Sequence, residues 1–375
     1  MCLVFLCFTL RQRRGTLTAI KGLQMKTAFL GMTGSGKSTL LAAVSGRKLP
    51  QAGSTQIEEV IAKVPDERLD WLYNLYKPKK NVPATIDCLD LPGLSFADDH
   101  CRAAARRLLG NVRTCDLLVL VIRAFDNAGL KADPINELSQ LMTEILLADL
   151  ELVETRITNL EKQVNKPSKD QGKQKMELAF QLRLRQAIES EKPLKTAIQS
   201  PEEAELVKPL GFLTLKPIVV VFNTPENEPA KVFDTKNVLD QSIPVISVCA
   251  EIEYEISQLD EDSRKDFMKD LGLTESAAHK LIRSCYSALG LINFFTVGED
   301  ETRAWPIKAG TTALDAAGKI HSDIKRGFIR AETISFADLK QYGDEKAVKA
   351  AGKFRLEGKT YVVQDGDIMN FRFNV

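Results

Sequence analysis

A glycine-rich turn that ends in Lys-Ser-Thr carries the clearest chemistry in this chain of 375 residues. Residues 26–39 read KTAFLGMTGSGKST, and their spacing fits the G-x-x-x-x-G-K-[ST] pattern of a phosphate-binding P-loop. In that pattern the glycines let backbone N–H groups face a phosphate, the lysine neutralises the β- and γ-phosphates, and the serine hydroxyl binds Mg²⁺. We therefore predict that a nucleotide binds at Gly31, Thr33, Gly34, Ser35, Gly36, Lys37, Ser38 and Thr39.

The flanking sequence separates this motif from an ordinary glycine-rich turn. An apolar strand precedes it and an apolar helix opening at Thr39 follows it, which is the order of elements that a P-loop requires. The helix would add the positive end of its dipole to the phosphate site.

A second motif, DLPG, ends a strand-like stretch and has the D-x-x-G form. We predict that Asp90 supports the Mg²⁺ ion and that the backbone N–H of Gly93 senses the γ-phosphate. Leu94 then stands where Ras-like enzymes place the glutamine that orients the attacking water. Because leucine cannot orient water, we expect slow hydrolysis, and His100 is the alternative catalytic group if turnover proves fast.

The polar turn after the P-loop helix offers a further Mg²⁺ ligand. In switch NTPases a threonine from this segment reaches the metal and the γ-phosphate, and Thr55 or Ser54 is the hydroxyl placed to do so. A solvated turn without a role is an equally good interpretation. The predicted cofactor is Mg²⁺, and its predicted ligands are Ser38, Thr55 and Asp90.

The residues that would read the base follow a later apolar strand. The tetrapeptide NTPE at 223–226 stands where a GTPase carries Asn-Lys-x-Asp, whose aspartate accepts two hydrogen bonds from guanine. An asparagine amide can instead pair with the N6 donor and the N7 acceptor of adenine. We therefore predict Asn223 as the main base reader and ATP as the preferred nucleotide. The rest of the predicted base site is Thr224, Glu226, Ser247, Cys249 and Ala250.

Composition limits the function classes. The 51 basic and 50 acidic residues give a net charge of +1, so no global field attracts DNA or a membrane. Seven scattered cysteines without a C-x-x-C pair fit a reducing cytoplasm. Residues 1–24 contain an apolar run too short to span a bilayer, and we interpret them as an unstructured extension. The oligomeric state stays open.

Apolar runs that alternate with helical segments predict a doubly wound α/β sheet with the motifs at the carboxyl ends of its strands. We assign residues 25–133 and 213–290 to this nucleotide-binding domain. Residues 134–212 form a helical insertion with the apolar spacing of a coiled-coil hairpin. Residues 291–375, rich in short strands and turns, form a separate domain. The predicted coiled-coil seam is Leu146, Leu150, Val153, Ile157, Leu160 and Val164.

The C-terminal domain contains a local basic patch within HSDIKRGFIRAE. Its side chains, from His321, Lys325, Arg326 and Arg330, could contact RNA phosphates. The alternative is a solvated helix face with a histidine that stabilises the fold. No RNP-type aromatic motif accompanies the patch.

From residue 25 to residue 375 the chain resembles the YchF/Obg-like ATPase family. The likeness is carried by SVCAEIEYEISQLD, by LGLINFFTVGEDETRAWPIKAGTTALDAAGKIHSDIKRGFIRAETI and by AGKFRLEGKTYVVQDGDIMNFRFNV. The resemblance implies a Ras-like P-loop domain interrupted by a helical coiled coil and followed by a C-terminal TGS domain with a β-grasp fold. It also implies an N-x-x-E motif with ATP preferred over GTP, a hydrophobic residue in place of the catalytic glutamine, and association with ribosomes. The residues that match these features are Asn223, Glu226 and Leu94.

Three segments depart from the family pattern. The chain has Gly34 where the family P-loop has Asn, lacks the N-[YF]-P-F-C-T-I segment of switch I, and has SFADDHCRAAARRLLG in place of the glycine-rich A-S-K-G-E-G-L-G. These departures bear on hydrolysis more than on binding. We expect a cytoplasmic, ribosome-associated ATP switch with slow hydrolysis. The alternatives are a nucleotide-binding scaffold with little turnover and a true GTPase.

Overall fold

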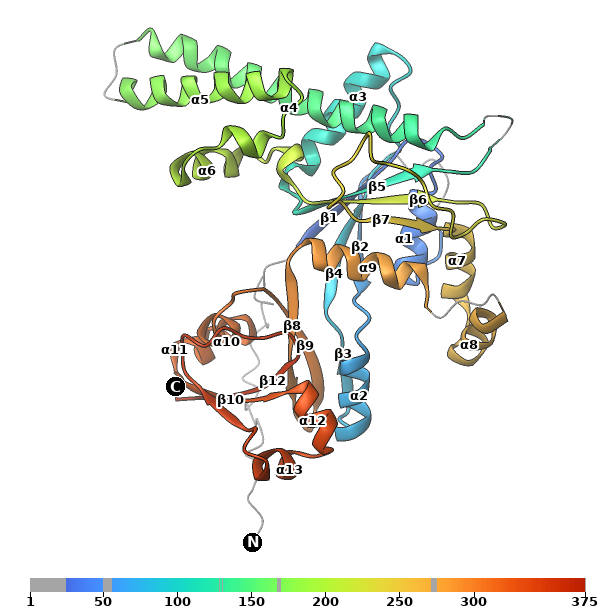
Figure 1. Cartoon of the computed structure of the whole chain (residues 1–375), viewed down its shortest axis with the longest axis vertical. Coiled ribbons are helices and arrows are strands. Elements are labelled where there is room, and N and C mark those ends of the chain that lie inside the picture. The colour runs from blue at the N-terminus through green and yellow to red at the C-terminus, as the bar shows by residue number, and fades with distance from the viewer. Residues whose placement is uncertain are drawn as a thin grey trace. The chain divides into compact units, whose positions relative to one another are not determined.

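The computed structural model describes residues 25–49, 56–127, 129, 131–166, 170–270 and 275–374. They form two compact units (Figure 1), one made of residues 25–61 and 87–288 and the other of residues 62–86 and 289–374. The extension 1–24, Ser54 and Thr55 lie outside the described residues. The chain therefore enters the second unit once between the P-loop and the D-x-x-G motif, and again at its carboxyl end.

A six-stranded sheet organises the first unit. Its strands are β1 (Lys26–Leu30), β2 (Glu58–Lys63), β4 (Thr85–Asp90), β5 (Leu117–Arg123), β6 (Ile218–Asn223) and β7 (Val245–Val248). The order is β2-β4-β1-β5-β6-β7, and the pairs from β4 to β7 are parallel. The central strands β1, β5 and β6 are buried almost throughout, as their continuous apolar sequences predict. The carboxyl ends of the parallel strands consequently meet at one edge of the sheet.

Helices cover both faces of this sheet. On one face lie α1 (Lys37–Ser45), α7 (Ala250–Gln258) and α9 (Ala277–Ala288). On the other, α3 (Asp99–Asn111) and the start of α4 (Pro134–Val164) pack on an apolar core that includes Leu109, Leu138 and Ile122. The doubly wound arrangement predicted from the sequence is confirmed. Further elements of the unit are α8 (Glu261–Asp270), η1 (Val112–Thr114), η3 (Lys208–Leu210) and η4 (Leu213–Leu215).

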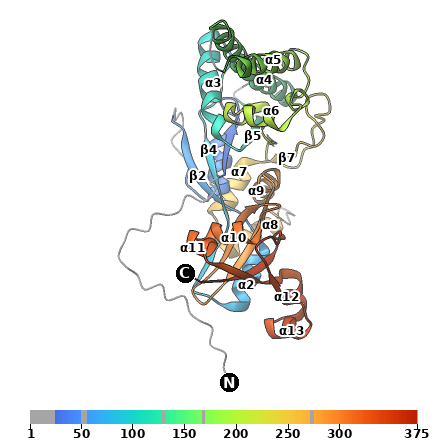
Figure 2. The same ribbon diagram turned by 90° about the vertical axis from the view of Figure 1, so that its left-hand side faces the viewer.

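The inserted segment forms a helical arm, in which α4 and α5 (Gln171–Glu189) lie side by side (Figure 2). The predicted seam residues Val153, Ile157 and Leu160 are buried, and the first two pack against residues of α5 such as Phe180 and Leu184. Leu146 and Leu150 pack at the margin of the same core. The arm is completed by η2 (Leu194–Ala197) and α6 (Pro201–Val207).

A buried aspartate fixes the base of the arm. Asp149 of α4 is fully buried, and its carboxylate accepts backbone N–H bonds from Leu213 and Thr214 at 3.1 and 2.8 Å. The guanidinium of Arg113 donates to the same carboxylate at 2.6 Å. Because the buried charge is both paired and hydrogen-bonded, it can be kept in the interior and hold the start and the end of the insertion together.

A second buried acid connects α4 to α3. The carboxylate of Glu144 accepts a hydrogen bond from Nη2 of Arg106 at 2.6 Å, and Nε of Arg102 lies 3.4 Å from it. Arg106 also pairs with Glu151, further along α4. The helix that follows the D-x-x-G motif is thus ion-paired to the first helix of the arm.

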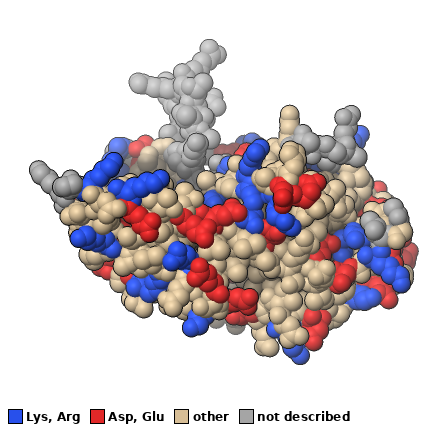
Figure 3. Space-filling model, turned by 90° about the horizontal axis from the view of Figure 1, so that it is seen from above, with Lys and Arg blue, Asp and Glu red and all other residues tan. Residues whose placement is uncertain are grey.

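Surface charge is mixed on the face shown in Figure 3, where Lys and Arg side chains lie among Asp and Glu side chains. This pattern agrees with the net charge of +1. Among the described helices, none is long and apolar enough to cross a membrane.

The second unit contains a six-stranded mixed sheet. Its strands are β3 (Lys80–Val82), β8 (Leu291–Val297), β9 (Glu301–Lys308), β10 (Phe328–Ser335), β11 (Arg355–Glu357) and β12 (Asp367–Phe373), in the order β11-β10-β12-β8-β9-β3. Residues of α10 (Ala313–Ile320) and α11 (Ser322–Arg326) share an apolar core with Phe294 and Phe371. This is the small α+β domain expected at the carboxyl end. Its remaining helices are α2 (Glu67–Tyr76), α12 (Phe336–Tyr342) and α13 (Glu345–Ala350).

Residues 62–86 belong to this second unit through specific contacts. The guanidinium of Arg68 donates to Asp66 and to Asp365, each at 2.8 to 3.2 Å. The amide of Asn293 donates to Asp66 at 3.0 Å, and β3 extends the sheet by pairing with β9. Between the P-loop and the D-x-x-G motif the chain therefore contributes one strand, β3, to the C-terminal sheet.

Candidate functional site

The P-loop runs from β1 into α1, and two of its glycines are required by close contacts. Gly36 has φ of +83°, and a β-carbon on it would lie 2.0 Å from Nδ2 of Asn223. A β-carbon on Gly31 would lie 2.3 Å from the carbonyl oxygen of Val121 on β5. Any side chain at either position would collide with its neighbour, so only glycine lets the loop lie directly against the ends of β5 and β6.

Helix α1 begins at Lys37, two residues earlier than the start expected at Thr39, because Gly36 already takes the cap position. Gly36 offers no side-chain cap to the first N–H groups of the helix, which leaves this helix end suited to binding an anion. Lys37 is buried, and burial lowers the pKa of its ammonium group, while the nearby carboxylate of Asp90 opposes that shift. A phosphate beside Lys37 would restore a favourable environment for its positive charge.

Asp90 and Ser38 provide a ligand set that fits Mg²⁺. Asp90 ends β4 and is buried, and its Oδ1 has no hydrogen-bond partner among the described residues. Burial raises the pKa of the Asp90 carboxyl, while a hydrogen bond with the Ser38 side chain acts in the opposite direction. Carboxylate and hydroxyl oxygens are the hard ligands that Mg²⁺ prefers. Thr55, the third predicted ligand, lies outside the described residues.

Asn223 at the end of β6 joins the P-loop to the last loop of the site. Its Nδ2 donates to the carbonyl of Ser35 at 2.9 Å, and its Oδ1 accepts the backbone N–H of Ala250 at 3.0 Å. The side chain is 5% exposed. These bonds use one of the two amide hydrogens and one of the two oxygen lone pairs, so one donor and one acceptor site remain for a ligand.

A cavity of about 1030 Å³ opens beside Asn223 and the P-loop. Its size is just above the range typical of small-molecule sites. Seven residues predicted from the sequence line it, namely Gly36, Thr39, Asn223, Thr224, Glu226, Cys249 and Ala250. Eight further residues line it that were not among the site residues predicted from the sequence, namely Leu49, Phe125, Asp126, Pro225, Asn227, Glu251, Tyr254 and Glu255.

Two predicted base-site residues have their hydroxyls engaged by the protein. Thr224 is buried, and its hydroxyl donates to the carbonyl of Pro229 at 3.1 Å. The hydroxyl of Ser247 donates to the carbonyl of Lys231. Both bonds hold the loop that follows β6, and Ser247 does not line the cavity.

Leu94 connects the D-x-x-G motif to the P-loop through its backbone. Its N–H donates to the carbonyl of Gly31 and its carbonyl accepts the N–H of Thr33, both at 3.0 Å. Its side chain is 1% exposed and lies in the apolar core with Leu91 and Phe96. The side chain is therefore part of the interior, and the expectation that it cannot orient water agrees with this placement.

Two family models match the chain. The one described as a 50S ribosome-binding GTPase matches residues 26–156, and the C-terminal model of the YchF GTPases, described as a protein of unknown function (DUF933), matches residues 291–374. The ribosome-binding ATPase YchF of Bacillus subtilis (strain 168) is 39% identical over 372 residues, covering 94% of this chain and 100% of that protein. The chain belongs to the YchF family.

Other relatives agree with this membership. Obg-like ATPase 1 of Caenorhabditis elegans is 34% identical over 371 residues, covering 94% of this chain and 93% of that protein. The solved structure of the Schizosaccharomyces pombe YchF GTPase superposes with a TM-score of 0.76 at 31% identity, covering 93% of this chain and 98% of that one. The YchF fold expected from the resemblance is confirmed.

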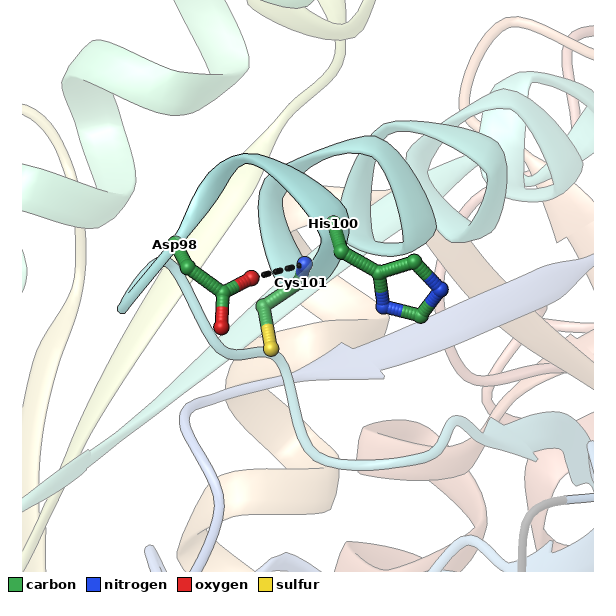
Figure 4. A group of neighbouring side chains, drawn as sticks. All are labelled: Asp98, His100 and Cys101. Carbon is green, nitrogen blue, oxygen red and sulfur yellow. Dashed lines mark hydrogen bonds between the residues drawn. The ribbon is translucent and has the colours of Figure 1, made fainter.

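His100, the alternative catalytic group, lies outside the cavity of this YchF-family chain. It is exposed in the first turn of α3, where its ring, the thiol of Cys101 and the carboxylate of Asp98 have their ligating atoms within 4.8 Å of one another (Figure 4). The Asp98 carboxylate caps α3 by accepting the Cys101 backbone N–H at 2.7 Å, and this bond also lowers the pKa of Asp98. Helix capping thus accounts for the grouping.

The basic patch of the second unit is largely paired with its own acids. Lys325 donates to Asp315 at 2.8 Å, and Arg326 pairs with Asp323 at 2.9 Å. Nδ1 of His321 accepts the backbone N–H of Asp323 and caps α11. The solvated helix face considered for these residues therefore describes their contacts better than an open cationic surface does.

Proposed function

We propose that this YchF-family chain is a Mg²⁺-dependent purine-nucleotide switch that prefers ATP to GTP, hydrolyses it slowly and acts in association with the ribosome. The observation that carries the proposal is the position of Asn223, fixed between the P-loop and Ala250 at the edge of a nucleotide-sized cavity. Its remaining donor and acceptor suit N7 and N6 of adenine.

The loop after Asn223 supports the preference for ATP. Guanine specificity needs a carboxylate held where it can accept two hydrogen bonds from N1–H and the exocyclic amine. Here Glu226 is exposed and one methylene longer than aspartate, and Thr224 is turned to the Pro229 carbonyl. A guanine edge would thus leave donors poorly paired in the cavity, which costs about 1–3 kcal/mol.

Slow hydrolysis follows from the switch region. Leu94 is in the core, and the Asp98 cap orders α3 directly after the motif. A water at the γ-phosphate therefore has no glutamine to orient it, and unassisted switch NTPases of this kind turn over at about 10⁻² s⁻¹ or below.

The names of the relatives support the ribosome as the proposed partner. YchF of Bacillus subtilis is named a ribosome-binding ATPase, and one matching family model is described as a 50S ribosome-binding GTPase. The second candidate is a true GTPase, favoured by that description and by the name of the Schizosaccharomyces pombe relative, a YchF GTPase. A nucleotide-binding scaffold with little turnover is the third.

Calorimetric titration with non-hydrolysable ATP and GTP analogues, with and without Mg²⁺, tests the proposal. We expect ATP to bind at least about tenfold more tightly than GTP, and only weak binding without Mg²⁺. Lys37→Ala should lose binding but keep the fold, because the lysine's task is to neutralise phosphate charge. Equal affinities or a GTP preference would favour the true GTPase. Co-sedimentation with 70S ribosomes in each nucleotide state tests the partner.

A further inference from the structure

We propose that Thr33 is a catalytic residue whose hydroxyl orients the attacking water, the task that Leu94 cannot perform. The proposal rests on the proposed nucleotide hydrolysis and adds a residue to that site. Thr33 is the third residue of the P-loop and is exposed, whereas the Leu94 side chain is buried.

The backbone fixes Thr33 against the D-x-x-G motif. The N–H of Thr33 donates to the carbonyl of Leu94 at 3.0 Å, and the N–H of Leu94 donates to Gly31 at 3.0 Å. Met32 and Leu94 form a parallel β-bridge between these two bonds. The P-loop and Leu94, which follows the D-x-x-G motif, are therefore joined by main-chain bonds, which do not depend on side-chain rotamers.

Gly93 allows the Thr33 side chain to lie over this junction. A β-carbon on Gly93 would stand 2.7 Å from Cα and 2.8 Å from Oγ1 of Thr33, so any larger residue would displace the threonine. Gly93 is the residue whose N–H is expected to face the γ-phosphate. The Thr33 hydroxyl thus lies next to the group that detects the reacting phosphate.

The polarity of this hydroxyl follows from its partner. Oγ1 of Thr33 lies 3.4 Å from the Leu94 carbonyl, a long hydrogen bond in which the hydroxyl must be the donor because a carbonyl can only accept. With its proton directed to that carbonyl, the oxygen presents lone pairs to solvent. It can then accept a hydrogen bond from a water molecule, which is the interaction that a glutamine carbonyl makes in Ras-like enzymes.

The reaction balances without a proton change on Thr33. The water oxygen bonds to the γ-phosphorus while the bond from that phosphorus to the β-γ bridging oxygen breaks. The two water protons leave with the phosphate product, and the threonine keeps its own proton. Thr33 therefore acts by orientation alone.

Two substitutions of Thr33 distinguish the contribution of its hydroxyl to hydrolysis from the contribution of its side-chain shape. Thr33→Val keeps the branched shape and removes the hydroxyl, whereas Thr33→Ser keeps the hydroxyl. We expect Thr33→Val to lower the single-turnover rate of ATP hydrolysis at least about tenfold, the factor that corresponds to one lost transition-state interaction. Its affinity for a non-hydrolysable ATP analogue should change less than about threefold, because the phosphate contacts predicted for the P-loop come from backbone N–H groups, Lys37 and Ser38, all of which the valine variant keeps. Thr33→Ser should hydrolyse ATP close to the unmodified rate.

The outcomes are distinct. Unchanged hydrolysis by Thr33→Val overturns the proposal, and so does an equal loss in Thr33→Ser, because a loss that the retained hydroxyl does not rescue reflects packing. An unmodified protein that binds ATP but releases no phosphate overturns it as well. Failure of the unmodified protein to bind ATP contradicts the proposed function itself, and analogue titration identifies that case before any rate is measured.

Discussion

Nδ2 of Asn223 lies only 2.0 Å from the point where a β-carbon on Gly36 would stand. The absence of a side chain at one position is what allows the amide of the other to reach the Ser35 carbonyl at 2.9 Å. The phosphate loop and the base site are thereby built around a single contact. Changes at either residue should disturb both.

Asn223→Asp tests this contact. The variant keeps an oxygen to accept the Ala250 N–H but replaces the donor to Ser35 with a carboxylate oxygen facing a carbonyl. We expect nucleotide affinity to fall at least about tenfold and stability to fall by about 1–3 kcal/mol, the range for a buried acceptor left unpaired. Calorimetric titration and denaturant unfolding measure the two effects. Asn237→Asp, at an exposed residue outside the cavity lining, is the matched control, and an equal loss there would contradict the assignment.

Asp90→Asn should stabilise the nucleotide-free protein while weakening Mg²⁺-dependent binding. The fold raises the pKa of Asp90 above its usual value through burial, so the ionised carboxylate lowers stability at neutral pH. That loss disappears as the pH falls through the raised, folded-state pKa, because the folded form then binds the proton more readily than the unfolded form.

The asparagine removes the charge at every pH. We expect a higher melting temperature, because the folded state no longer keeps a buried carboxylate ionised. Thermal unfolding without nucleotide measures it, with the exposed Asp262→Asn as control. A lower melting temperature for Asp90→Asn would show that the carboxylate stabilises the loop before metal binds.

Glu144→Ala should loosen the junction between α3 and α4. The side chain is nearly buried and accepts from Arg106 at 2.6 Å, so its removal leaves a largely buried guanidinium with one partner fewer. We expect a loss of roughly 2–3 kcal/mol in the free energy of unfolding. Glu154→Ala, an exposed position on the same helix, should change it by less than about 0.5 kcal/mol. Similar unfolding midpoints for the two variants would refute the claim that Glu144 fastens the arm.

The site residues predicted from the sequence belong to short local patterns or end a predicted strand. Gly31 to Thr39 and Asp90 to Gly93 are contiguous motifs, and Asn223 follows a strand whose carboxyl end could only meet the others at one edge of the sheet. Phe125 and Tyr254 reach the cavity from two other elements. Phe125 stands just past the end of β5, and this position next to a strand end could have predicted it as a cavity residue. Tyr254 lies one turn into α7, where nothing in the sequence predicts that it lines the cavity.

No local sequence pattern predicts that residues 62–86 belong to the second unit. It depends on pairs such as Arg68 with Asp365, which are 297 residues apart in the chain. Strand β3 has only three residues, which is too short for its sequence to predict the strand with which it pairs. Contacts of this kind are set by tertiary packing, so periodicity and turn residues could not reveal them.

The last prediction concerns the choice of base. The double change Thr224→Lys with Glu226→Asp restores the Asn-Lys-x-Asp pattern, with Pro225 at the variable position, and should narrow or reverse the expected ATP preference. A shorter carboxylate can approach the two guanine donors, and the lysine stem can cover the base. The buried Thr224 loses its bond to Pro229 in the process, so affinity for both nucleotides should fall somewhat.

The unmodified protein and the double variant are each titrated calorimetrically with non-hydrolysable ATP and GTP analogues. The ratio of the two affinities is compared between the proteins, because a loss of affinity common to both nucleotides does not change this ratio. Glu228→Asp, further along the same loop and outside the cavity lining, should leave the ratio unchanged. The expected change in the ratio is at least about tenfold, because a well-formed bidentate pair of hydrogen bonds to a base edge is worth about 1–3 kcal/mol of discrimination. If the ratio in the double variant equals that of the unmodified protein, the residues after Asn223 do not select the base, and selection must come from the amide itself or from the walls formed by Phe125 and Tyr254.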